Sequence, residues 1–184
     1  MQTLGISDTT TRSESRLKSL LWPSVENATD VDYLGSQGYW TCAAVGVFSF
    51  AVLAMLGQPI MALIVLLYFF LGGVGVREHS FYAAVMVFAM FVADLFFSSP
   101  SILKILLSAI LLSNVRATWI ASRWKAESDE AVVPPRLNTT LADKFADQLP
   151  KWLWPKVRIA YYIFAAALFA LTVLGLILIN RRRI

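Results

Sequence analysis

The sequence predicts an all-α, polytopic integral membrane protein with about five transmembrane helices: two tight hairpins and a C-terminal span. Of its 184 residues, 58% are apolar and only 15% are charged, whereas an ordinary soluble domain is about 45–50% apolar and about 25% charged. The apolar residues gather in runs close to the length that crosses a bilayer, about 17–25 residues. The runs are continuously apolar instead of alternating, which excludes the strands of a membrane β-barrel.

Residues 40–121 form the predicted four-helix transmembrane region. The apolar runs are Trp40–Leu56, Ile60–Val76, Phe81–Phe97 and Ser101–Ala121. They are separated by Gly57-Gln58-Pro59, Arg77-Glu78-His79 and Ser98-Ser99-Pro100. Because these breaker and charged residues leave room only for tight turns, consecutive runs are expected to lie antiparallel, as two helical hairpins.

Three further segments complete the predicted organisation. Residues 1–39 are a polar N-terminal tail, in which Arg12–Trp22 is either a short interfacial helix or part of a solvated tail. Residues 122–158 are a loop with a short amphipathic helix, which Thr140 caps and Pro150 ends. Residues 159–184 contain the fifth transmembrane helix, Ile159–Asn180, and an arginine-rich C-terminus.

Basic residues predict how the chain sits in the membrane. With five spans, the N-terminus, the 77–79 turn and the 122–158 loop share one side, which carries eleven Lys and Arg residues; the other side carries only Arg181, Arg182 and Arg183. The positive-inside rule therefore places the first side in the cytoplasm and the C-terminus outside. The membrane is expected to be the plasma (inner) membrane. The three terminal arginines favour the opposite orientation, which remains the alternative.

Tryptophans mark the same side of the predicted bundle. Those at span ends are Trp40, Trp119, Trp124, Trp152 and Trp154. Since tryptophan prefers the headgroup level of either interface, we predict that these five side chains anchor the protein there. These tryptophans indicate that the two sides of the bundle differ, but they do not show which side faces the cytoplasm.

Asp94 and Lys104 are the candidate site within the apolar block. Each lies five positions from Ser99, the centre of the turn between the third and fourth runs, so both are expected at the same depth, about 7 Å from the turn at 1.5 Å per residue. Since isolated charges inside a bilayer are costly, we predict that they form an intramembrane ion pair. The pair is either an ion or proton site, an inter-subunit contact, or a structural clasp of the hairpin; the alternative to a pair is that Lys104 snorkels to the membrane surface.

The other motifs do not indicate a catalytic or ligand-binding site. The glycine cluster Leu71–Val76 is predicted to permit close helix packing or to loosen a helix end. A single histidine and a single, distant cysteine, Cys42, make a poor metal site. No nucleophile–base set, zinc-protease motif or phosphate-binding loop is present, so neither a catalytic residue nor a cofactor is expected.

The predicted function follows from these features. We expect a small multi-pass membrane protein that acts as a non-catalytic accessory, scaffold or assembly subunit. Its expected partners are the lipid bilayer and another membrane protein or further copies of itself; a nucleic acid is not expected. The alternative is a transporter or channel component that uses the Asp94/Lys104 pair.

Overall fold

The computed structural model describes residues 28–97, 101–123 and 152–181, and all of its secondary structure there is helical. The helices are α2 (Ala28–Met55), α3 (Pro59–Arg77), α4 (Phe81–Phe97), α5 (Ile102–Arg123) and α7 (Leu153–Arg181). The predicted all-α fold is thus confirmed.

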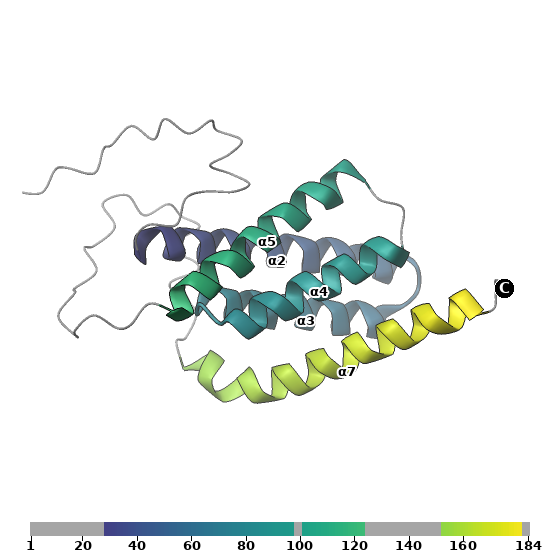
Figure 1. Cartoon of the computed structure of the whole chain (residues 1–184). Coiled ribbons are helices and arrows are strands. Elements are labelled where there is room, and N and C mark those ends of the chain that lie inside the picture. The colour runs from purple at the N-terminus through teal and green to yellow at the C-terminus, as the bar shows by residue number, and fades with distance from the viewer. Residues whose placement is uncertain (1–27, 98–100, 124–151, 182–184) are drawn as a thin grey trace, which may run out of the picture.

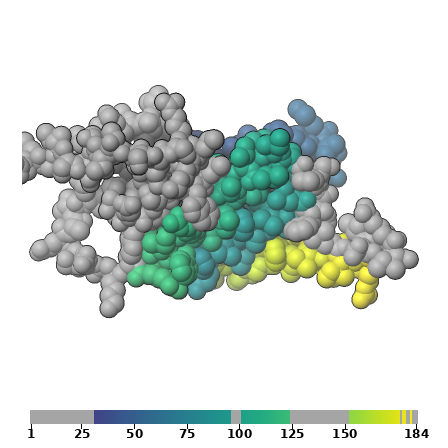
Figure 2. Space-filling model, turned by 45° about the horizontal axis from the view of Figure 1, so that its top comes forward, coloured from purple at the N-terminus to yellow at the C-terminus, as the bar shows by residue number. Residues whose placement is uncertain are grey.

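Four of these helices form a closed ring. α2 and α3 make the first hairpin, α4 and α5 make the second, and α2 also packs on α5 while α3 packs on α4 (Figure 1). α7 lies outside this ring, against α3 and α4. Figure 2 shows α5, α4 and α7 side by side on one face of the molecule. The two predicted hairpins and the separate C-terminal helix are therefore confirmed.

Helix α3 packs against α2, α4 and α7, and we call it the hub of the bundle. Three glycines in its C-terminal half let these neighbours approach its backbone. Gly73 lies against Cys42 of α2, and Gly72 lies against Val87 of α4. Glycine lets helix backbones approach closely inside a membrane, where packing replaces the hydrophobic driving force. Of the two interpretations of the glycine cluster, close packing is the one found, and α3 continues unbroken to Arg77.

The two ends of the bundle are packed differently. Near the 77–79 turn, Leu34, Val76 and Tyr161 have exposed fractions of only 1%. At the opposite end, Met55 and Ile60 are 88% and 74% exposed, and α7 runs away from the other helices (Figure 1). We call the first end the packed end and the second the splayed end.

The helices have the dimensions of membrane spans. Four of them are long and apolar enough to cross a bilayer: Val31–Met55, Pro59–Arg77, Ile102–Arg123 and Leu153–Gly175. α4 has 17 residues, which is the short limit of the usual range, but it runs between α3 and α5 as a full member of the ring. The chain is an integral membrane protein.

Two helices begin earlier than their apolar runs. α2 starts twelve residues before Trp40, within the segment expected to be a polar tail, and α7 starts six residues before Ile159. In α2, Val31, Leu34, Gly35 and Gly38 are buried at the i, i+3, i+4, i+7 spacing of one helix face. This segment forms a helix with a buried face although its average composition is polar. The predicted helices at 12–22 and 140–149 lie outside the described residues.

Candidate functional site

Asp94 and Lys104 lie together at the splayed end. The Lys104 Nζ donates a hydrogen bond to Asp94 Oδ2 at 2.9 Å. Ser101 accepts a hydrogen bond from the Lys104 backbone N–H through its Oγ, at 3.3 Å, and so caps the start of α5. The Asp94 side chain is 57% exposed and that of Lys104 is 29% exposed. The pair thus joins the hairpin on its outer surface.

Neither charge is placed to stabilise its own helix. Asp94 lies in the last turn of α4 and Lys104 in the first turn of α5, where the helix dipole disfavours a negative and a positive charge respectively. The ion pair therefore offsets the unfavourable position of each charge in its own helix.

A second polar contact lies at the packed end, and the sequence did not reveal it. His79 Nε2 lies 3.1 Å from Asp32 Oδ1, so the α3–α4 turn is connected to the first turns of α2. Asp32 was missed because it falls in the segment expected to be a tail. The buried stripe from Val31 to Gly38 was the signal that could have placed it on a helix.

The backbone at His79 explains how its side chain reaches α2. His79 has a φ of 54°, and it occupies the C′ position of a helix-ending motif in which Ser80 N–H donates to Gly75 O and His79 N–H to Val76 O. Glycine is usual at this left-handed position; Gly57 has it in the α2–α3 turn, with φ 76°. The imidazole lies beside Gly35, where a Cβ would meet it at an ordinary contact distance of 3.4 Å.

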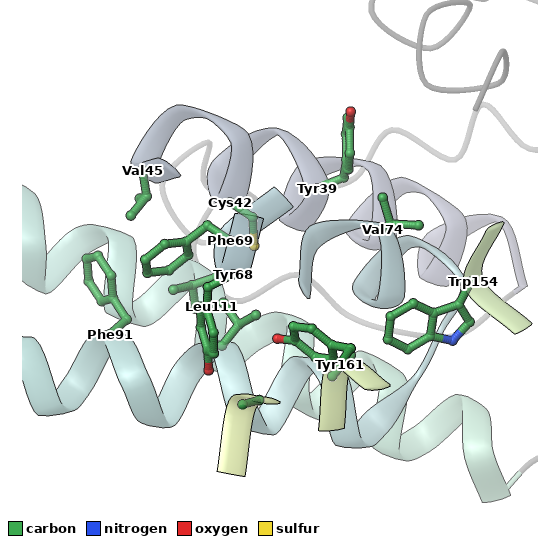
Figure 3. Close-up of a cluster of buried hydrophobic side chains, with 13 residues drawn as sticks. Tyr39, Cys42, Val45, Tyr68, Phe69, Val74, Phe91, Leu111, Trp154 and Tyr161 are labelled. Atoms are coloured by element: carbon green, nitrogen blue, oxygen red, sulfur yellow. The ribbon is translucent and has the colours of Figure 1, made fainter. Parts of the chain in front are cut away.

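An aromatic cluster docks α7 onto the hub. Trp154 packs beside Gly75 of α3 and Ala83 of α4, and a Cβ on Gly75 would overlap both. Figure 3 shows Tyr161 between Trp154 and Tyr68, with ring centroids 5.7 and 5.8 Å from theirs.

Hydrogen bonds fix the edges of this cluster. The Tyr68 hydroxyl donates to the Met86 carbonyl at 2.7 Å, and the hydroxyls of Ser80 and Tyr162 lie 2.7 Å apart. The first bond connects α3 to α4, and the second connects the start of α4 to α7. Side chains from three helices therefore close the bundle at its packed end.

The predicted tryptophan anchors divide into two groups. Trp40, Trp119 and Trp152 are 39%, 43% and 60% exposed and lie toward the packed end. Arg123 stacks over the Trp119 ring at 3.7 Å, and Lys156 lies 4.9 Å from the Trp152 ring centroid. Trp124 lies outside the described residues.

Trp154 is buried, unlike the other described tryptophans of the predicted belt. It is only 7% exposed. Its ring fills the space left by the missing side chain of Gly75 on α3, next to Ala83 of α4. Its side chain packs α7 against α3 and α4, and its role as a headgroup anchor stays a prediction.

Buried polar side chains also line α5. Asn114 and Thr118 are each 1% exposed, and each donates to a carbonyl of its own helix, Ile110 O and Asn114 O, at 2.9 Å. The Asn114 amide lies against Gly38 of α2, where small residues bring the two helices close. These two donors are satisfied within α5, whereas Asn114 Oδ1 and the Ser113 hydroxyl are buried without a hydrogen-bond partner in the described part of the chain.

The described part of the chain holds no group of three or more His, Cys, Asp or Glu side chains that could bind a metal ion. The candidate site comprises the Asp94–Lys104 ion pair, the His79–Asp32 contact and the aromatic docking cluster. Comparison with protein-family models, curated proteins and solved structures finds no match for this chain.

Proposed function

We propose that this protein is a non-catalytic membrane subunit, acting as an accessory, scaffold or assembly component of a larger membrane complex. The observation that carries the proposal is how the packed end is filled. Trp154, Tyr161 and Tyr68 occupy the space between α3, α4 and α7, and glycines bring the backbones into contact. Such packing makes a rigid frame.

The placement of charge favours a frame over a pathway. Asp94 and Lys104 bind each other on the outer surface of the hairpin, whereas a transport site is usually aimed at the interior of the bundle or at a water-filled cavity. His79 and Asp32 hold two helices together at the other end. Both pairs connect elements of the frame.

We further propose that the packed end faces the cytoplasm and that the membrane is the plasma (inner) membrane. The support is the excess of Lys and Arg on that side, in the N-terminal segment and in residues 122–158. In this orientation both segments are available to a cytoplasmic partner or to lipid headgroups.

The proposal predicts a stable complex and no transport. The tagged full chain, extracted from its native membrane in mild detergent, should co-purify with a membrane protein in a fixed ratio. In sealed vesicles, the purified chain should give no flux of protons, Na⁺, K⁺ or Cl⁻ above empty vesicles. Asp94→Asn should likewise give no flux above empty vesicles.

Transport is the outcome that would overturn this proposal. An ion flux that the wild-type chain supports, and that Asp94→Asn reduces by about tenfold or more, would make the pair a transport site. Glu78→Gln is the matched control: Glu78 is an exposed carboxylate at the opposite end of the bundle, and its replacement should not alter flux.

A further inference from the structure

The surface around the Asp94–Lys104 pair is unusual for a face that lipid would cover. Around it, the first turns of α5 expose large apolar side chains: Ile102 is 79% exposed, Leu103 is 65% exposed and Ile105 is 57% exposed. An apolar helix face is normal against lipid, but an exposed carboxylate and ammonium beside it are not. The combination is typical of a surface that another protein covers.

The charges on this face are complementary to those on the same face of a second copy. In an isologous two-fold interface the same patch meets itself, so that residue i of one copy contacts residue j of the other and the reverse. A patch with one carboxylate and one ammonium side by side satisfies this requirement. Rotation by two-fold symmetry can bring Asp94 to the partner's Lys104 and Lys104 to the partner's Asp94.

The energetics also favour a second copy over lipid. Each charge lies at the helix end whose dipole opposes it, as described above, and Lys104 Nζ lies 2.9 Å from Asp94 Oδ2. A second copy would bring an opposite charge of the partner close to each of them and would remove both from lipid. The exposed apolar side chains of α5 would pack against the partner at the same time.

We propose that the outer face of the α4–α5 hairpin is an interface with a second copy of this chain, in which Asp94 and Lys104 form a ring of four charges with the same two residues of the partner. This self-association is independent of the function proposed above, because a scaffold and a transporter are equally compatible with it.

Charge exchange between two chains tests this interface. Asp94→Lys gives a chain with two cations at the pair, and Lys104→Asp gives a chain with two anions. Each variant alone should lose self-association by on the order of tenfold or more, since like charges then face each other. Two differently tagged variants, one of each kind, should associate again when they are produced together.

A purely internal clasp gives a different result in this experiment. Both variants break the contact within the hairpin, so an internal clasp cannot be restored by the other chain. The readout is pull-down of one tag by the other from nanodiscs, with wild-type chains of both tags as reference. Wild-type chains that do not associate, or variants that do not regain association together, would overturn the proposal.

Cysteine cross-linking covers the case in which the charge variants fail to fold. In a Cys42→Ala background, which removes the single native thiol, Leu103→Cys should form a disulfide between copies in the membrane under mild oxidation. Ile163→Cys is the matched control, because Ile163 on α7 is 68% exposed against 65% for Leu103. Equal cross-linking of the two positions, or none at Leu103, would contradict the interface.

Discussion

Replacing Trp154 with alanine is expected to lower the free energy of unfolding by about 3 kcal/mol. Truncation of a buried Phe or Trp costs about 3–5 kcal/mol in soluble proteins, and the lower value is expected here because lipid, unlike water, offers apolar surroundings to the released surface. The ring is 7% exposed and fills the space above Gly75. Unfolding of the purified protein by SDS in mixed micelles measures the change.

Trp152→Ala is the matched control for this substitution. Trp152 lies two residues earlier, is 60% exposed and contacts Lys156 by a cation–π interaction, which is worth about 0.5–1 kcal/mol at an exposed site. Its loss should therefore cost less than about 1 kcal/mol. If the two substitutions lowered the free energy of unfolding equally, α7 would not dock through Trp154.

Replacing Gly75 with alanine is expected to destabilise the bundle from the other side of the same contact. The new methyl group would overlap the Trp154 ring and the Ala83 methyl, which belong to two different helices. Overpacking of this kind costs about 1–3 kcal/mol, and alanine returns about 1 kcal/mol through its higher helix propensity. A net loss of up to about 2 kcal/mol is expected from these two effects.

Gly175→Ala separates packing from helix propensity. Gly175 lies in α7, and a Cβ there would meet no atom within 4 Å, so this substitution should be neutral or stabilise the protein by up to about 1 kcal/mol. The same unfolding assay applies. A stabilising effect of Gly75→Ala equal to that of Gly175→Ala would show that α3 is not tightly packed at its C-terminal half.

The fold was largely predictable because a helix that crosses a membrane needs a long run of apolar residues, which is visible in the sequence. The turns at Gly57 and at Arg77–His79 divide the apolar runs where the helices end, and the run Phe81–Phe97 coincides with α4. The start of α2 could not be found by average hydropathy. There a single stripe of buried residues, with Asp32 and Gln37 beside it, makes the helix.

The candidate site was predictable only where it is local. Asp94 and Lys104 are ten positions apart, so hairpin geometry alone brought them to one depth. The contact of His79 with Asp32 and the docking of Trp154 on Gly75 join distant segments. Both depend on which face each helix turns toward its neighbours, and runs that are apolar on all sides do not reveal this.

The claim on which the others depend is that all five helices cross the membrane, with the packed end in the cytoplasm. Labelling of intact cells with a membrane-impermeant thiol reagent tests it, with single cysteines introduced into a Cys42→Ala chain. The positions are Gln58 and Glu78, exposed in the turns at opposite ends of the bundle, and a cysteine added after Ile184.

We expect Gln58→Cys and the added C-terminal cysteine to be labelled in intact cells, and Glu78→Cys to be labelled only after the membrane is opened. Labelling of Glu78→Cys alone in intact cells would reverse the orientation. Labelling of Glu78→Cys and the C-terminal cysteine together, on the same side of the membrane, would contradict the five crossings.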